Sequence, residues 1–312
     1  MCSIIFLFFR YQSAMIICKL SNSSENTETV SVVEKSVLRA NKTLTPTNYL
    51  NVTKNNNIKR NFTRCIPVLY DFHDKMALIQ MLETDILFGM EHFIIYYNND
   101  HNQSTVDDVL EFYQRKGVLE LIKWDLPVKT KDIHYHGQIA NMHDCLYRSM
   151  HRSTYVLFAD VDEVVISPVF KSWGGLTNNC LKLNCAALQF QNAFFPVVFK
   201  STNKNFSGMV DAVKYNMTFF LKTTHTKIHS HGDRSKLLVK PESIYFLFIH
   251  SVVKYYSKES QTCKVKHKDA MLHHYRKKLA IDMKTPYLEN TIIHSLSSRL
   301  IPNIIKAMNS VQ

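Results

Sequence analysis

Between residues 65 and 159 the chain alternates short apolar runs with stretches of helical periodicity. Strand-length runs occupy residues 65–70, 93–97, 118–124 and 155–159, and helical spacing of apolar residues marks 78–87, 106–113 and 138–150. Strands that alternate with helices usually pair in parallel through right-handed crossovers. The alternation therefore predicts an α/β fold with a mostly parallel sheet. The run at 155–159, which is apolar on both faces, is its predicted central strand.

The second half of the chain has a different pattern. Residues 186–195, 236–239 and 245–256 are predicted to be strands with few helical stretches between them, and a last helix is predicted at about 288–308. We therefore expect a mixed half beside the parallel sheet. In the first half, Gly89 and Gly117 are predicted to end two helices, and Ser104 is predicted to cap the second of them.

Composition divides the chain into three regions. Residues 1–20 contain an apolar run that Arg10 interrupts, shorter than the roughly twenty apolar residues of a membrane span. This segment fits a signal peptide, a signal anchor or simply a ragged N-terminus. Residues 21–62 are rich in Ser, Thr, Asn and Lys and predict a flexible stem. Residues 63–312 carry the patterned sequence and are predicted to form one globular domain.

Glycosylation sequons and cysteines both bear on the cellular compartment. Seven Asn-x-Ser/Thr sequons occur, at Asn22, Asn41, Asn51, Asn61, Asn102, Asn205 and Asn216, and four of them crowd before residue 65. Such crowding fits an exposed, glycosylatable segment in the secretory pathway. Seven cysteines agree with an oxidising compartment. Cys180 and Cys185 are close enough in sequence to bridge a loop.

The basic charge of the chain suggests an anionic ligand. Its net charge is +12 and its isoelectric point about 9.3. The lysines and arginines are scattered, and neither zinc-finger spacing nor a basic region followed by heptads is present. A basic surface also suits nucleotide sugars. We therefore expect no nucleic-acid partner.

The strongest chemical signal is the pair Asp160 and Asp162, in the sequence DVDE directly after the run at 155–159. Alternate residues on a strand share a face, so both carboxylates are predicted to project together from the carboxyl end of a central strand. Open α/β sheets bind ligands at that end. Two oxygen ligands at this spacing suit Mg²⁺ or Mn²⁺, with diphosphate oxygens and water completing the octahedron. A solvated acidic loop is the alternative, although unpaired carboxylates between apolar segments would be costly.

A second signal is the sequence LHHYR at residues 272–276. One histidine can supply a further metal ligand, for which we select His273, while His274 and Arg276 are predicted to contact the nucleotide. Taken alone, this cluster also fits ordinary surface residues. His250 follows an apolar run and fits either a metal ligand or, better, a hydrogen-bonded core histidine.

Together these segments resemble glycosyltransferase family 92, formerly domain of unknown function 23. The resemblance rests on ordered segments between about residues 65 and 300: GMEHFIIY at 89–96, YHGQ at 135–138, DCLYR at 144–148, DVDE at 160–163, VKPE at 239–242, IH at 249–250 and LHHYR at 272–276. It implies a GT-A-like fold, an inverting mechanism, UDP-galactose as donor, Mn²⁺ as metal and a single-pass type II Golgi membrane topology with a lumenal catalytic domain. By the same match, Asp160 and Asp162 become the nucleotide-sugar and metal residues. His273 or His274, with Arg276, would close over the diphosphate.

An inverting transfer needs a base that takes the proton of the acceptor hydroxyl. Asp233 is our candidate and Asp211 the second choice, because both lie between strand-like segments of the acceptor-side half. Each also fits an ordinary loop aspartate. Glu163 is predicted to point to the other face of the strand and to be structural. Two other functions stay open on this sequence: a non-catalytic glycan-binding protein on the same fold, and a metal-dependent phosphohydrolase.

Overall fold

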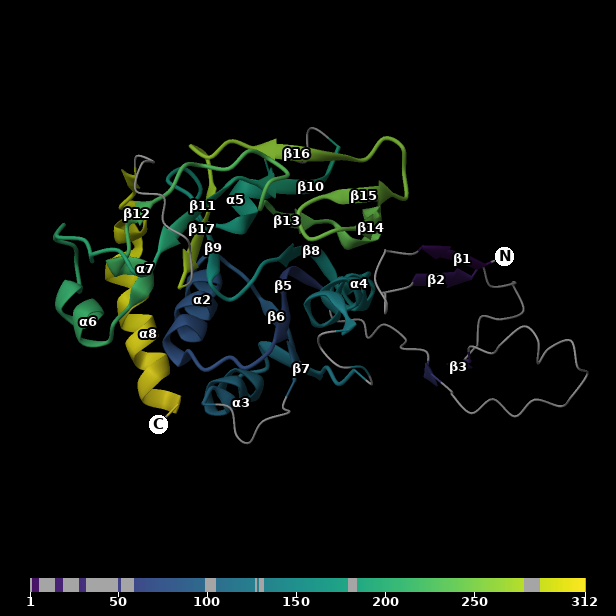
Figure 1. The fold of residues 1–312 in the computed structure, drawn as a ribbon, viewed down its shortest axis with the longest axis horizontal. Helices are drawn as coiled ribbons and strands as arrows, with labels where there is room; N and C mark the ends of the chain where they lie inside the picture. The colour runs from purple at the N-terminus through teal and green to yellow at the C-terminus, as the bar shows by residue number, and fades with distance from the viewer. Residues whose placement is uncertain are drawn as a thin grey trace, which may run out of the picture.

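The computed structural model describes residues 2–5, 15–18, 28–31, 50–51, 59–98, 105–126, 128, 132–178, 184–277 and 287–311. Its centre is a seven-stranded sheet with the strand order β16-β10-β13-β8-β5-β6-β7 (Figure 1). The strands are β5 (Arg60–Leu69), β6 (His92–Tyr97), β7 (Leu119–Lys123), β8 (Ser153–Phe158), β10 (Cys185–Phe190), β13 (Lys236–Val239) and β16 (Gln261–Val265). β7, β6, β5 and β8 run parallel, whereas β13 pairs antiparallel with both β8 and β10. The predicted α/β class, with a mostly parallel sheet and a mixed second half, is confirmed.

Helices cover both faces of this sheet. The α-helices of the described residues are α2 (Lys75–Leu87), α3 (Asp107–Arg115), α4 (Gln138–Ser149), α5 (Trp173–Asn178), α6 (Met209–Lys214), α7 (Thr218–Leu221) and α8 (Ser297–Val311). α2, α3 and α8 pack beside one another on one face (Figure 1). α4 packs on the other face. Because side chains alternate along a strand, β5 contributes to the packing on both faces. Phe62 and Ile66 pack on the face covered by α2, α3 and α8, and Cys65 packs on the face covered by α4.

A smaller sheet lies beside the large one, with the order β11-β17-β9. Its strands are β9 (Glu163–Ile166), β11 (Asn192–Pro196) and β17 (Met271–Arg276). β17 pairs parallel with β11 and antiparallel with β9. The remaining elements are β1 (Cys2–Ile5), β2 (Met15–Cys18), β3 (Thr29–Val30), β4 (Leu50–Asn51), β12 (Thr224–His225), β14 (Ile244–Leu247), β15 (Val252–Tyr255), β18 (Leu288–Glu289), η3 (His134–Gly137), η5 (Pro241–Ser243) and η6 (Ile292–Leu296).

Local signals account for most of the first half. The Asp74 side chain caps α2 by accepting from the Ala77 amide at 2.9 Å. The helix ends before Gly89, whose φ of 95° favours glycine, as predicted. The predicted helix cap Ser104 lies outside the described residues, and the residue before α3 is Val106. β5 begins at Arg60, inside the range 21–62 predicted to be the stem.

Three predictions for the second half are wrong. The predicted strand at 186–195 is two strands, β10 and β11, which separate at Gln191 and enter different sheets. The predicted strand at 245–256 is the hairpin of β14 and β15. The predicted helix at 288–308 begins only at Ser297, because Leu288 and Glu289 pair with β12.

Two disulfides occur within the described residues, one between the sheet and a helix and one between neighbouring strands. Cys65 of β5 bonds to Cys145 of α4, and Cys185 of β10 bonds to Cys263 of β16. The predicted bridge between Cys180 and Cys185 is therefore wrong, because Cys185 already has a partner; Cys180 lies outside the described residues. Within the described ranges, no helix has both the length and the apolarity needed to cross a bilayer.

Candidate active site

The carboxyl ends of β5 and β8 meet where the chain order of the parallel strands reverses. β6 follows β5 in sequence and lies on one side of it, whereas β8, reached only after β7, lies on the other. Open α/β sheets bind ligands at such a switch point. Two adjoining cavities, called here the large and the small cavity, open there, with volumes of about 790 and 410 Å³.

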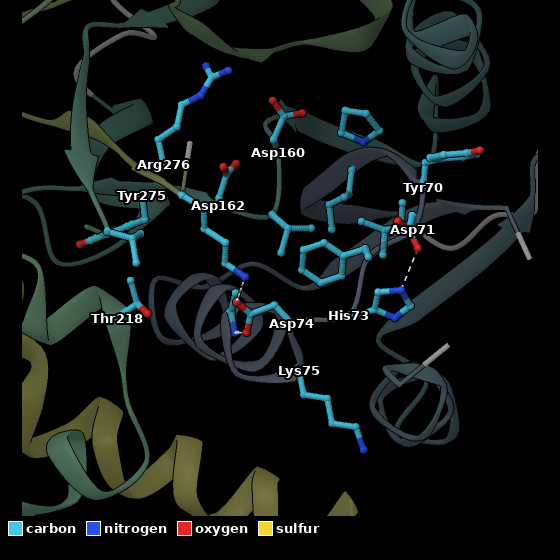
Figure 2. Close-up of a pocket in the computed structure, with 18 of the residues that line it drawn as sticks. Tyr70, Asp71, His73, Asp74, Lys75, Asp160, Asp162, Thr218, Tyr275 and Arg276 are labelled. Atoms are coloured by element: carbon cyan, nitrogen blue, oxygen red, sulfur yellow. Dashed lines mark hydrogen bonds and ion pairs between the residues drawn. The ribbon is translucent and has the colours of Figure 1, made fainter. Parts of the chain in front are cut away.

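Asp160 and Asp162 line both cavities (Figure 2). They lie in the turn between β8, which ends at Phe158, and β9, which begins at Glu163. The prediction that strand alternation sets both carboxylates on one face is therefore wrong, because neither residue lies on a strand. The turn nevertheless brings both carboxylates to the same two cavities. Their side chains are 37% and 41% exposed, so both can reach a ligand.

Glu163 also belongs to the site, which corrects the prediction that it points away. Its side chain is only 1% exposed, and its Oε2 accepts from the Asp160 amide at 2.9 Å. The Glu163 amide donates to the Asp160 carbonyl at 3.1 Å and closes a turn, so the side-chain alternation of β8 does not continue to Glu163. Burial works against the charge of Glu163, but Lys236 and His274 outweigh it and hold the pKa of Glu163 below its usual range.

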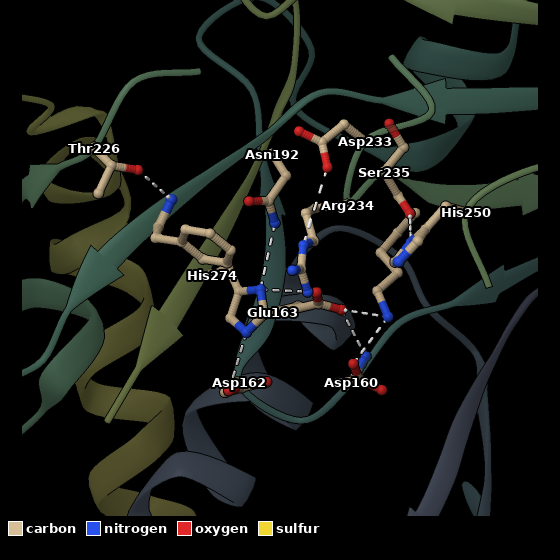
Figure 3. A network of polar contacts seen from close by, with 12 residues as sticks. Asp160, Asp162, Glu163, Asn192, Thr226, Asp233, Arg234, Ser235, His250 and His274 are labelled. Atoms are coloured by element: carbon tan, nitrogen blue, oxygen red, sulfur yellow. Dashed lines mark hydrogen bonds and ion pairs between the residues drawn. The ribbon is translucent and has the colours of Figure 1, made fainter. Parts of the chain in front are cut away.

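Lys236 and His274 supply the positive charges of this network (Figure 3). Lys236, the first residue of β13, places its Nζ 2.8 Å from Asp160 and 3.2 Å from Glu163. His274 lies 3.1 Å from Glu163 through Nδ1 and 3.3 Å from Asp162 through Nε2. Burial disfavours its charged form, but Glu163 and Asp162 outweigh burial and raise the pKa of His274 to about 10.

His273 does not join the carboxylates, so its selection as a metal ligand is corrected to His274. Successive residues of β17 face opposite sides of the small sheet, and the pairing register sets His274, not His273, opposite Glu163. The His273 ring instead stacks on Phe195 with centroids 4.3 Å apart. Burial lowers the pKa of His273 to about 3, which keeps it neutral.

A buried arginine fixes the acidic turn from beneath. Arg64 of β5 is fully buried, and its Nη1 donates to Asp85 of α2 at 2.6 Å. Its Nη2 donates to the backbone carbonyls of Asp160 and, at 2.8 Å, of Glu163. The guanidinium thus holds both ends of the turn against the sheet, a use that its planar fork of donors permits.

Sequence reasoning missed Arg64, Lys236 and the role of Glu163. A weak signal existed for the two cations, because each is a charged residue at or beside a strand-like apolar run, where an unpaired charge would be costly. The sequence did not show which carboxylates they meet, since those partners lie 21 to 76 residues away along the chain.

The other predicted residues divide between those near the cavities and those away from them. Arg276 lines both cavities, and its guanidinium lies 5.6 Å from the Phe194 ring centroid. Asp233 and Asp211 are not among the described residues that line either cavity. The Asp233 carboxylate is 59% exposed and bonds to His229 at 2.7 Å, which lowers its pKa. The predicted base Asp233 and the second candidate Asp211 therefore lie outside the two cavities that Asp160 and Asp162 line.

The donor set fits a divalent cation only in part. Among the described residues, no group of three or more His, Cys, Asp and Glu side chains could hold a metal ion by itself. Asp162 Oδ2 and His274 Nε2 lie 3.3 Å apart, close to the roughly 3.0 Å that separates adjacent ligands in an octahedron with bonds of about 2.1 Å. These two atoms can serve as protein ligands, with substrate and water supplying the rest. His274 would have to give up its proton to do so.

Comparisons with known proteins agree on the class of enzyme. The Glycosyltransferase family 92 model matches residues 60–308. The beta-1,4-galactosyltransferase galt-1 of Caenorhabditis elegans is 32% identical over 109 residues, which are 35% of this chain and 25% of that protein. The chain thus matches about a quarter of the length of this curated relative.

Solved structures are similar only at a low level. Glucosyl-3-phosphoglycerate synthase of M. tuberculosis has 10% identity and a TM-score of 0.33, over 80% of this chain and 81% of that one. TarS of S. aureus has 15% identity and a TM-score of 0.28, over 46% of this chain and 22% of that one.

Proposed function

The chain belongs to glycosyltransferase family 92, and from this premise we propose that it is an inverting, metal-dependent galactosyltransferase. It would transfer galactose from UDP-galactose to a glycan acceptor such as an N-glycan. The observation that carries the proposal is the pair Asp160 and Asp162, which opens into both cavities at the switch point of the sheet. Their surroundings suit a charged ligand, because Arg276 lines the same space.

The proposed reaction is a single in-line displacement. The acceptor hydroxyl oxygen forms a bond to the anomeric carbon while the bond from that carbon to the diphosphate oxygen breaks. The electron pair leaves with UDP, and a base takes the hydroxyl proton. Attack opposite the leaving group inverts the anomeric configuration.

The large cavity suits the nucleotide. At about 790 Å³ it lies within the usual range for ligand pockets. Tyr70, which is 37% exposed, offers an aromatic face at its wall and stacks on His136 with centroids 4.1 Å apart. Lys277 lies at the same cavity and pairs with Asp74 at 2.6 Å.

The diphosphate would lie between Arg276 and the acidic turn. Arg276 can donate to phosphate oxygens in fork geometry. Asp162 and His274 would hold Mn²⁺ or Mg²⁺, which when bound neutralises charge on the departing diphosphate. Lys236 already compensates the negative charges of Asp160 and Glu163.

A donor screen tests this proposal. The purified chain is incubated with several UDP-sugars and N-glycan acceptors, with Mn²⁺ or with EDTA, and the product linkage is determined. We expect transfer from UDP-galactose that EDTA abolishes, and a loss of about 10²–10³-fold in Asp162→Asn, as for other removed transition-state contacts. Asp211→Asn is the matched control and keeps wild-type turnover.

Two outcomes would favour the rival functions. Hydrolysis of the donor that acceptor does not diminish would favour a phosphohydrolase. Absence of metal-dependent UDP binding in calorimetry, with glycan binding retained, would favour a glycan-binding protein. Wild-type transfer by Asp162→Asn would refute the site.

The proposal also places the enzyme in the Golgi, as a single-pass type II protein with its catalytic domain in the lumen. The two disulfides support a lumenal location, because such bonds persist in oxidising compartments. Protease protection and carbonate extraction of microsomes containing the tagged chain test the location and the attachment separately. Digestion of the domain in intact microsomes would contradict the lumenal location.

A further inference from the structure

The small cavity contains a histidine, His250, that the proposed reaction has not used so far. His250 lies in the bend between β14 and β15 and lines this cavity together with Asp160, Asp162 and Lys236. Figure 3 shows His250 beside Ser235 on the Asp160 side of the network, with His274 on the Asp162 side. The two histidines therefore approach the carboxylates from different sides.

Hydrogen bonding fixes the tautomer of His250. Its Nδ1 lies 2.8 Å from the Ser235 carbonyl, which can only accept, so Nδ1 carries the hydrogen. In the neutral ring Nε2 then holds a lone pair. Within the described part of the chain, Nε2 has no hydrogen-bond partner. It is also not fully buried, since it is absent from the set of buried polar atoms that lack a partner. A second contact, from Gln189 Nε2 to the His250 carbonyl at 2.8 Å, holds the backbone of this residue.

The charges around His250 favour its neutral form. Burial lowers its pKa, and the nearby charges of Lys236 and Arg234 lower it further. The Ser235 carbonyl and Glu163 raise it, without reversing the shift. At neutral pH the ring is therefore able to accept a proton.

Every other proton acceptor at the small cavity has a different task. Asp160 and Glu163 bind Lys236, and Asp162 contacts His274. The His136 ring is stacked on Tyr70, and its Nδ1 is buried without a partner. Among the described residues that line this cavity, His250 alone combines a fixed tautomer with an open lone pair.

The same cavity has features of a sugar subsite. Tyr135, His136 and Gly137 are consecutive residues with φ of 44°, 53° and 76°. Such backbone persists only where its surroundings hold it, and it gathers at ligand sites. Here the Trp124 indole donates to the His136 carbonyl at 3.0 Å. Tyr135 is 67% exposed and lines the cavity, so its wall includes an aromatic side chain, as in many ligand pockets.

We propose that His250 is the general base of the transfer, and that the small cavity binds the acceptor hydroxyl. This inference rests on the proposed galactosyltransferase function. His250 Nε2 takes the proton of the acceptor hydroxyl as its oxygen bonds to the anomeric carbon and UDP departs with the bonding pair. The imidazolium then releases its proton to solvent, which restores the base and balances the step.

The test uses His250→Asn in the full chain. The asparagine amide nitrogen takes the place of Nδ1 and can still donate to Ser235, but it offers nothing at the position of Nε2. We expect kcat to fall by about 10²–10⁴-fold, the usual contribution of a general base. UDP binding in the presence of Mn²⁺ should stay within twofold of wild type. The acidic limb of the kcat/KM profile should disappear, and added imidazole should restore part of the rate.

His231→Asn is the matched control, because His231 bonds to the Val265 carbonyl and is not among the described residues lining either cavity. It should transfer within threefold of wild type. His250→Gln and thermal melts accompany both variants. Turnover of His250→Asn within fivefold of wild type, a retained acidic limb, lost UDP binding or failure of both His250 variants to fold would each overturn the assignment. If wild type neither binds UDP nor transfers sugar, the proposed function itself fails.

Discussion

The buried pair of Arg64 and Asp85 leads to the most informative stability experiment. The Arg64 side chain is 0% exposed and that of Asp85 1% exposed. Asp85→Asn keeps the shape but leaves a buried guanidinium without its counter-charge. Breaking one partner of such a pair costs about 3–5 kcal/mol. At roughly 2–4 °C per kcal/mol for a domain of this size, the melting temperature should fall by about 6–20 °C.

The assay is urea unfolding followed by circular dichroism, with thermal melts in parallel. Glu111→Gln is the control, because Glu111 and Arg115 form an exposed pair at 3.7 Å. Exposed pairs contribute less than about 1 kcal/mol. A loss below about 1 kcal/mol in Asp85→Asn would refute the reasoning about this pair.

The double variant Arg64→Met/Asp85→Leu separates stability from function. Replacing both charges by apolar groups removes the unpaired charge, so it should recover most of the stability lost in Asp85→Asn. It also removes the donors to the carbonyls of Asp160 and Glu163. Transfer should therefore stay low in a folded protein. A stable double variant with full transfer would show that Arg64 does not position the turn.

Three further predictions concern separate parts of the fold. Replacing Cys185 and Cys263 together by serine should lower the free energy of unfolding by about 2–5 kcal/mol in urea titrations; a loss under about 1 kcal/mol would contradict it. Burial lowers the pKa of His143 from 6.5, so the unfolded chain binds more protons below pH 6.5. Stability should then fall on acidification by up to about 1.4 kcal/mol per pH unit more steeply than in His143→Gln; equal slopes would contradict it. Lys236→Met leaves Asp160 without its cation and Glu163 with His274 alone, and should cost about 3–5 kcal/mol and most of the transfer rate; an unaltered melt would contradict it.

Local periodicity was enough to predict most elements of the first half. α2, α4 and β6 have nearly the predicted ranges, because the apolar spacing that marks each of them lies within a few residues along the chain. The division of residues 186–195 had no such local signal. Residues on both sides of Gln191 stay buried, so the apolar run continues although the chain passes from one sheet to the other.

The site was predicted in part for the same reason. Asp160 and Asp162 could be identified because a carboxylate pair after an apolar strand is a local pattern. Their neighbours come from distant segments: Arg64 from β5, Lys236 from β13 and His274 from β17. No periodicity links these positions, so only the folded chain shows which charges compensate one another.

The choice between His273 and His274 depends on one register. β17 enters the small sheet between β9 and β11, and its antiparallel pairing sets His274 opposite Glu163. A slip of one residue would turn every side chain of β17 to the other face and bring His273 to the carboxylates. Asp162 follows a strand of the large sheet, whereas His274 lies on a strand of the small one. The proposed metal pair therefore exists only because the two sheets pack in this register, and a motif of adjacent histidines cannot specify it.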